Sequence, residues 1–225
     1  MRFVIIGTGR CGTTWISHIL TAAGIRCGHE NIWRPDQYND RWLFLDEHGE
    51  RIEYFGCASV YALPYLERSG FDGVILHQIR EPAACIGSLV GWRLPSWPNK
   101  QGAGGQFIND NLRFELTGDR IADASNYWCE WNERCMRVAN FTYHVEDINP
   151  ETLVTFAGLV GRELTETVAA AAIAEYADWD YSAAPARPDM KAIPVNIADL
   201  PVAVRAMGEL HGYKDDATRP QTSRQ

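Results

Sequence analysis

Apolar runs and amphipathic segments alternate along most of this chain. The opening run "RFVIIG", residues 2–7, and the run from Gly73 to Ile79 are rich in apolar residues, as expected for buried strands of a parallel sheet. The segment from Thr13 to Ala23 places its apolar residues three and four positions apart, which predicts a helix with one buried face, and Gly24 is expected to end it. A strand followed directly by a helix predicts βαβ units.

The rest of the chain continues this alternation. In chain order it predicts a helix opened by Pro82, a long helix over Asp119–Ala139, a strand in "NFTYHVE" (140–146), a helix from Asn149 and Pro150 to Gly161, and a helix in "ETVAAAAIAEYA" (166–177). The pattern predicts the secondary structure of two stretches less clearly. "GIRC" (24–27) is a candidate second strand, and residues 41–56 are compatible either with a hairpin that turns at "HGE" or with irregular structure.

These elements predict one α/β domain. Strands separated by helices indicate a three-layer α/β/α fold around a central, mainly parallel sheet, and 225 residues suffice for one large core. We assign residues 1–213 to this single domain and expect the polar end, residues 214–225, to be a disordered tail. Residues 92–106 are rich in glycine and proline and predict a long loop, of the kind that commonly acts as a lid or binding loop.

Charge and cysteine content limit the classes of partner. The chain carries 21 lysines and arginines against 29 aspartates and glutamates, a formal net charge of −8. This balance argues against nucleic-acid binding, so an anionic ligand must be held by local features. Six scattered cysteines, with no C-x-x-C pair and no histidines at zinc spacing, favour free thiols in a reducing compartment and no metal site. Because the chain opens on a core strand and has no apolar run of membrane-spanning length, we expect a cytoplasmic protein with no membrane span.

The junction between the first strand and the first helix carries the clearest chemical signal. "GTGRCGTT" (7–14) follows the nucleotide-binding pattern G-x-x-x-x-G-K-[ST] at its glycines and last threonine, but Thr13 stands at the lysine position. Arg10 supplies a cation inside the loop instead. Backbone N–H groups, the helix dipole, two hydroxyls and a planar guanidinium together favour a bound phosphate or sulfate group. The alternative is a tight turn whose glycines serve packing alone.

Two enzyme classes fit this loop less well. A P-loop nucleotide hydrolase needs the lysine and an acidic strand end that holds Mg²⁺, whereas the next clear strand ends in Arg80. A cysteine phosphatase needs an arginine six residues after its nucleophile, and the residue six positions after Cys11 is Ser17. We therefore interpret the Cys11 side chain as a small packing group. A nucleotide kinase with an atypical loop stays as an alternative function.

These residues resemble the sulfotransferases that use 3′-phosphoadenosine 5′-phosphosulfate (PAPS). "IIGTGRCGTTWISHIL" (5–20) is similar to that family's 5′-phosphosulfate loop. "QIREPAACIGSL" (78–89) resembles its 3′-phosphate motif, in which a serine follows a strand-end arginine by eight residues, here Ser88 and Arg80. "YWCEWNERCM", "YHVEDI" and the short "HGYK" resemble later and weaker elements of the family. The resemblance implies a P-loop-like nucleotide-binding fold and sulfotransferase activity.

The resemblance also implies two separated anion sites, one for each phosphate-bearing end of PAPS. The residues that would hold the 5′-phosphosulfate are Gly9, Arg10, Cys11, Gly12, Thr13, Thr14 and Trp15. Arg80 and Ser88 would hold the 3′-phosphate, with 3′-phosphoadenosine 5′-phosphate (PAP) as the product and no metal ion required. Arg10 would stabilise the charge that builds on the bridging oxygen as the nucleotide leaves. For Arg80 the alternative is a surface ion pair, for example with Glu81.

The acceptor in such a reaction needs a base, and "CGHENIW" (27–33) supplies two candidates. The chain resembles the carbohydrate-type sulfotransferases more than the phenol type, and in that type a glutamate roughly twenty residues after the loop cation is the base. This implies Glu30, with His29 as rival or orienting partner; a solvated pair with no catalytic role is the alternative. The expected acceptor is a hydroxyl or amine of a carbohydrate or small molecule, with Trp92 and Trp97 as candidates for stacking on it. A non-catalytic nucleotide-binding relative is the remaining alternative.

Overall fold

A parallel five-stranded sheet forms the centre of the protein. The computed structural model describes residues 1–30, 32–33, 43–45, 51–53, 55–92, 103–177 and 192–213. In spatial order the sheet contains β2 (Cys27–His29), β5 (Gly56–Ala58), β1 (Phe3–Ile6), β6 (Val74–Ile79) and β7 (Phe141–His144), all paired in parallel. A separate antiparallel pair joins β3 (Leu43–Leu45) to β4 (Arg51–Glu53).

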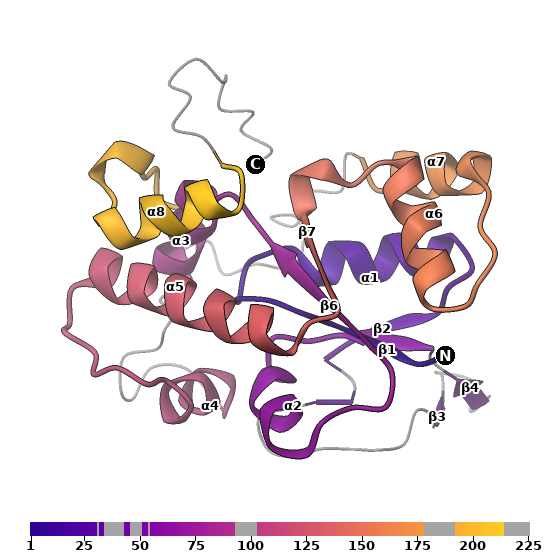
Figure 1. Cartoon of the computed structure of the whole chain (residues 1–225), viewed down its shortest axis with the longest axis horizontal. Helices are drawn as coiled ribbons and strands as arrows, with labels where there is room; N and C mark the ends of the chain where they lie inside the picture. Colours follow the sequence, from indigo (N-terminus) through magenta and orange to yellow (C-terminus); the bar gives the residue numbers. More distant parts are fainter. Residues whose placement is uncertain are drawn as a thin grey trace.

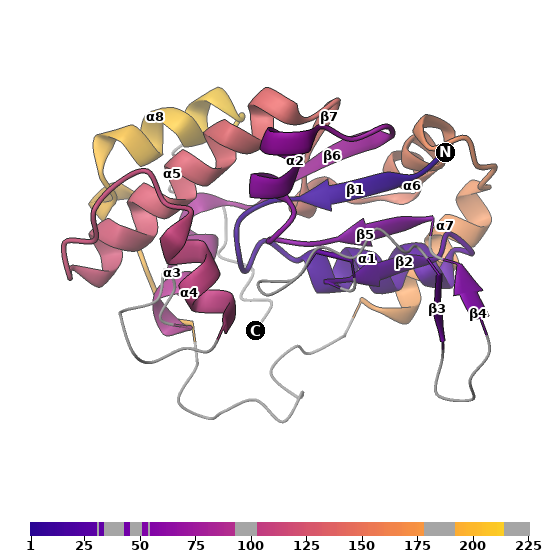
Figure 2. The ribbon, with the colours of Figure 1, turned by 90° about the horizontal axis from the view of Figure 1, so that it is seen from below.

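Helices cover both faces of the sheet (Figures 1 and 2). One face carries α1 (Thr13–Ala22), α6 (Pro150–Leu159) and α7 (Glu166–Glu175). The other carries α2 (Leu63–Ser69), α3 (Pro82–Gly91), α4 (Ala103–Asp110), α5 (Arg120–Val138) and α8 (Val202–Leu210). The strand period of two explains the division, because Phe3 and Ile5 of β1 pack into the first cluster whereas Val4 and Ile6 pack into the second. The predicted three-layer α/β/α fold with a mainly parallel sheet is confirmed.

The order of the strands determines where a ligand site is expected. From β1 the chain moves outward to β2, returns to β5, and then crosses to β6 and β7 on the other side of β1. In open parallel sheets of this kind, ligands bind at the carboxyl ends of the strands where the direction of winding changes. Here that point lies between β1 and β6, so the loop after Ile6 and the residues after Ile79 adjoin it.

Several elements differ from the sequence-based predictions. The second strand begins at Cys27, the last residue of the "GIRC" candidate, and β5, α2 and α8 were not predicted. The predicted loop 92–106 is wrong at its end, because α4 already begins at Ala103; residues 93–102 lie outside the described residues, as does the predicted tail 214–225. The antiparallel pairing of β3 with β4 favours the hairpin interpretation of residues 41–56, although the "HGE" turn itself is not among the described residues. In the described part of the chain, no helix combines the length and apolar character needed to cross a membrane.

Candidate anion-binding site

The loop between β1 and α1 has the backbone shape of an anion-binding turn. Gly12 has a φ of 97° and Arg10 a φ of 70°, both in the left-handed region. Such turns point successive N–H groups into one concavity. No side chain caps the N-terminus of α1, so the first helical turn presents its N–H groups and positive dipole end at the same place. At Gly7 a Cβ atom would lie 2.4 Å from the carbonyl oxygen of Gln78, so only glycine lets the loop leave the sheet this closely to β6.

Hydrogen bonds to buried side chains hold the backbone of this loop in place. The Gly9 N–H donates to the Tyr127 hydroxyl at 3.0 Å, and the Gln78 amide donates to the Cys11 carbonyl at 2.6 Å. Tyr143 in turn donates to the Gln78 side-chain oxygen at 2.6 Å. The Cys11 thiol is fully buried, and burial raises its pKa, which agrees with a packing role rather than a nucleophilic one. Gln78 had a sequence signal, a long polar residue within an apolar strand. Tyr127 and Tyr143 open the stretches "YWCEWNERCM" and "YHVEDI", but no sequence feature pointed to their contacts below the loop.

The two predicted anion sites meet at Arg10. Its Nε atom donates to the Ser88 hydroxyl at 2.9 Å, and Nη1 of Arg80 donates to the Arg10 carbonyl at 3.0 Å. The Arg10 guanidinium carbon also lies 4.1 Å from the centre of the Trp92 ring, which holds the cation by its π face. The structure therefore brings together Arg10 from the first loop, Arg80 from the end of β6 and Ser88 from α3.

His29 and Glu30 lie beside the first turn of α1, where His29 contacts two threonines. Nε2 of His29 is 3.3 Å from the Thr13 hydroxyl and 3.0 Å from the Thr14 hydroxyl, and 3.7 Å from a carboxylate oxygen of Glu30. Burial, and then the nearby His18, lowers the pKa of His29 to about 4, so the imidazole is neutral at neutral pH. In the tautomer with its proton on Nδ1, the ring accepts from the threonine hydroxyls at Nε2.

Backbone strain marks two of the three residues predicted to be catalytic. Among the residues that the structure describes, Arg10 and Glu30 are the non-glycine residues with positive φ, at 70° and 54°. This conformation costs a non-glycine residue roughly 1 kcal/mol or more, and such outliers cluster at functional sites. The strain gives both positions a physical signal that is independent of the sequence motif.

Other predicted residues have different surroundings. The Trp15 indole N–H donates to the Tyr176 carbonyl at 3.1 Å, and the ring packs against the core that contains α1, α6 and α7. Trp97, a candidate for stacking on the acceptor, lies outside the described residues. Trp33, in the same "CGHENIW" stretch as His29 and Glu30, is 1% exposed and belongs to the core. Burial, and then the charge of Glu30, raises the pKa of Tyr61, a residue that the sequence did not single out. Gly104 of α4 packs against its hydroxyl, where a Cβ would come within 2.3 Å.

Comparison of the sequence with protein-family models finds no match. Comparison with curated proteins finds none either. Among solved structures, mouse sulfotransferase SULT7A1 in complex with PAP aligns with 90% of this chain and 71% of its own, with a TM-score of 0.41 and 10% sequence identity.

Proposed function

We propose that this protein is a PAPS-dependent sulfotransferase that moves a sulfuryl group to a hydroxyl or amine of a carbohydrate or small molecule. The observation that carries the proposal is the convergence of Arg10, Arg80 and Ser88 beside the uncapped start of α1. Two cations from adjoining strand ends suit a ligand with two anionic groups, as PAPS has. The described strand end beside the loop carries Arg80 rather than a Mg²⁺-binding carboxylate, which favours this chemistry over nucleotide hydrolysis.

Each residue has a distinct part in the proposed reaction. The N–H groups of the loop and of the first helical turn bind the 5′-phosphosulfate, while Arg80 and Ser88 bind the 3′-phosphate. Glu30 accepts the proton of the acceptor group as the acceptor oxygen or nitrogen forms a bond to sulfur. His29 accepts from the Thr13 and Thr14 hydroxyls and so orients these hydroxyls of the loop. Arg10 stabilises the negative charge on the bridging oxygen as the bond between sulfur and that oxygen breaks and PAP leaves.

Stabilisation by PAP tests the proposed function directly. At one hundred times its Kd, a ligand that binds only the folded state adds about 2.7 kcal/mol, or a Tm shift of roughly 5–10 °C for a chain of this size. We expect this shift with PAP in the absence of Mg²⁺, together with transfer of labelled sulfate from PAPS to a member of an acceptor panel. Stabilisation by ATP only with Mg²⁺, and not by PAP, would instead favour a nucleotide kinase. Binding of PAP without transfer to any acceptor would favour a non-catalytic relative.

The lowered pKa of His29 gives an expectation for the pH profile. Because His29 titrates at about 4, kcat/KM should be level from about pH 5.5 to 7 and fall only as the pH approaches 4, since this ratio reports ionisations of the free enzyme. An unperturbed histidine acting as base would place the acid limb near pH 6.5, and a limb there would contradict the assignment. If Glu30 is the base, Glu30→Gln should remove most of the activity, whereas His29→Gln should leave most of it.

A further inference from the structure

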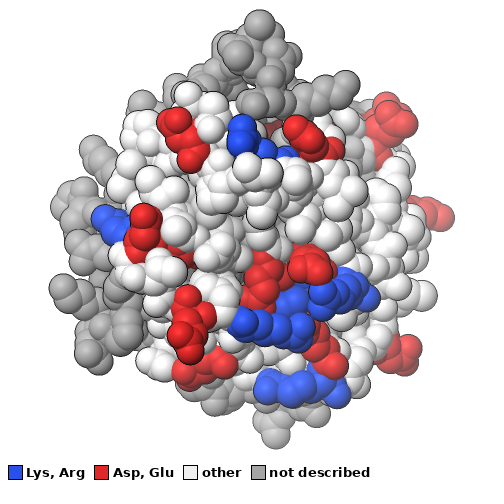
Figure 3. Space-filling view, turned by 60° about the vertical axis from the view of Figure 1, so that its left-hand side comes forward, with Lys and Arg blue, Asp and Glu red and all other residues white. Residues whose placement is uncertain are grey.

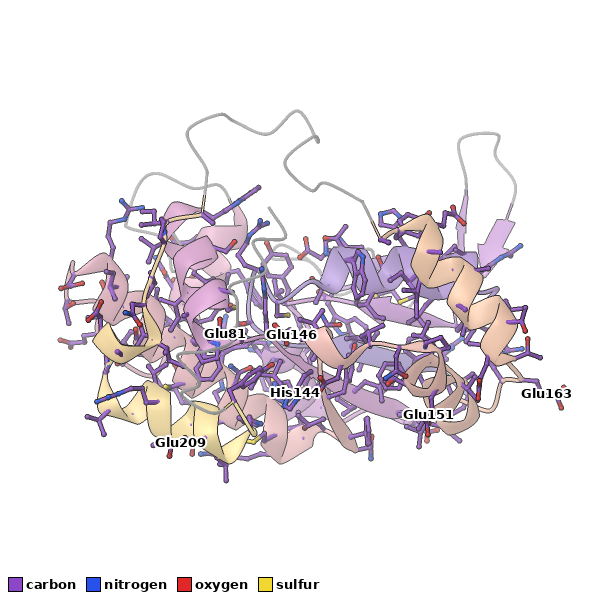
Figure 4. The ribbon with its side chains drawn as sticks, turned by 90° about the horizontal axis from the view of Figure 1, so that it is seen from above. Glu81, His144, Glu146, Glu151, Glu163 and Glu209 are labelled. Carbon is purple, nitrogen blue, oxygen red and sulfur yellow. The ribbon has the colours of Figure 1, made fainter. Side chains whose placement is uncertain are left out.

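The peptide groups on both sides of Arg80 are held by a carboxylate and a phenol from distant parts of the chain. One oxygen of Glu146 accepts from the Glu81 N–H at 2.9 Å, and the other accepts from the Tyr213 hydroxyl at 2.8 Å. The Tyr213 oxygen is also 3.4 Å from the carbonyl oxygen of Ile79. The residue after Arg80 is thus fixed by Glu146, and the residue before it lies next to the Tyr213 hydroxyl. Figure 4 shows Glu81 and Glu146 together, with His144 nearby, at the end of the sheet.

Further contacts hold Glu81 and Tyr213 in place. The Glu81 carboxylate accepts from the N–H groups of Ala83 and Ala84, so it caps α3 and fixes the turn that follows Arg80. The Tyr213 ring is 6% exposed and lies 4.6 Å, centre to centre, from the ring of His144. Glu146 is on the short helical turn Val145–Asp147 after β7, and Tyr213 follows α8. The turn from β6 to α3 is therefore held from two elements that are remote in sequence.

We propose that Glu146 and Tyr213 are positioning residues for Arg80, which makes the segment after α8 part of the site for the 3′-phosphate. The inference rests on the proposed function, because it concerns the anion that Arg80 binds. Neither residue needs to touch the ligand. Glu146 fixes the backbone of Glu81, Tyr213 fixes Glu146 and approaches Ile79, and the Arg80 guanidinium is thereby directed to the first loop, where it meets the Arg10 carbonyl. A preorganised arginine loses less freedom when it binds a phosphate.

If Glu146 and Tyr213 position Arg80, their replacement should weaken the binding of the 3′-phosphate and leave the rest of the nucleotide bound as before. PAP and AMP differ by the 3′-phosphate, so the ratio of their Kd values, measured by calorimetry, isolates that group. We expect Glu146→Ala and Tyr213→Phe each to lower the preference for PAP over AMP by roughly three- to tenfold, with the Kd of AMP nearly unchanged. Glu146→Gln keeps one acceptor oxygen and should restore part of the preference. Tyr213→Phe keeps the buried ring and so separates the hydroxyl contact from packing.

Two controls make the test specific. Glu163→Ala removes an exposed glutamate that lies far from Glu146 in Figure 4, and it should leave the preference unchanged. In an Arg80→Ala background the preference for PAP should already be reduced, and adding Glu146→Ala should cause no further loss.

The outcomes separate the inference from the proposed function. If the wild type does not prefer PAP over AMP, the proposed function fails, and the inference fails with it. If the wild type prefers PAP but Glu146→Ala and Tyr213→Phe keep the full preference, the positioning role is wrong and the proposed function stands. Equal losses of PAP and AMP affinity in folded variants would also overturn it, since they would indicate a general structural effect.

Discussion

Replacement of Arg10 by alanine is expected to lower kcat for sulfuryl transfer by roughly 10²–10³-fold, the effect of removing one preorganised charge from a developing anion. KM for PAPS should change much less, because the loop N–H groups, Arg80 and Ser88 still bind both anionic groups. Arg10→Lys should recover only part of the rate. Lysine keeps the positive charge but lacks the planar donor group that contacts the Ser88 hydroxyl. It also lacks the flat guanidinium that stacks on the Trp92 ring.

Steady-state kinetics with PAPS and an identified acceptor measure this effect. Arg137→Ala is a suitable control, because Arg137 is exposed and pairs with Glu133 on the same helix, away from the proposed site. A large rise in KM with kcat unchanged would reassign Arg10 to binding alone, and equal activity of Arg10→Ala and wild type would remove it from the reaction.

The stability of variants at position 10 should depend on the backbone conformation rather than on the lost charge. Arg10 has a φ of 70°, which a glycine adopts without strain and an alanine does not. Arg10→Gly should therefore be more stable than Arg10→Ala by about 1 kcal/mol, although both lack the guanidinium. Chemical denaturation of the two variants measures the difference. Strained residues of this kind cluster at functional sites, and the comparison measures how much stability the strained backbone at position 10 costs.

The parts of the site that the sequence predicted are local in the chain. The loop 7–14 and the pair Arg80 and Ser88 each lie within one strand–turn–helix unit, where glycine, hydroxyl and arginine spacing is enough to predict an anion site. The parallel sheet then brings the two units together, since β1 and β6 are neighbours. The fold class could be predicted for the same reason, and so could the meeting of the candidate anion-binding residues Arg10, Arg80 and Ser88.

The parts that the sequence did not predict depend on distant contacts. The strand β5 consists of "GCA", with no β-branched residue, and Gly56 is required because the Phe3 ring fills the place of a Cβ, at 2.0 Å. Tyr127 contacts Gly9 across 118 residues of sequence, and Tyr213 contacts Glu146 across 67. No spacing rule links such positions, so the supports of the loop and of Arg80 became evident only from the folded chain.

The largest effect on stability is expected from Arg134→Ala, because Arg134 joins α2 to α5 through a buried network. Arg134 is 3% exposed, and its Nε and Nη2 atoms donate to the two carboxylate oxygens of Glu67 at 2.9 and 2.6 Å. Nη1 donates to the Asn111 carbonyl at 2.7 Å and to Glu130 at 2.9 Å. Basic and acidic side chains are interleaved on the face turned forward in Figure 3, which is the left side of Figure 1. The truncation leaves the carboxylates of Glu67 and Glu130, whose side chains are 19% and 17% exposed, and the Asn111 carbonyl without their shared donor. Removing one partner of a fully buried pair costs about 3–5 kcal/mol, so we expect a loss of about 3 kcal/mol for these partly buried partners.

Denaturant unfolding should show this loss for Arg134→Ala, and a Tm lower by roughly 10 °C. The matched control Arg137→Ala removes an arginine three residues later in the same helix, but from an ion pair whose side chains are 56% and 51% exposed, so it should cost less than about 1 kcal/mol. The hydrogen bond from Arg134 lowers the pKa of Glu67. This pair therefore stabilises the protein above the ordinary glutamate pKa, and the stabilisation is lost as the pH falls through the lowered value. The difference between wild type and Arg134→Ala should thus narrow in acid, whereas a difference that stayed constant would mean that lost packing, rather than lost charge pairing, explains the effect.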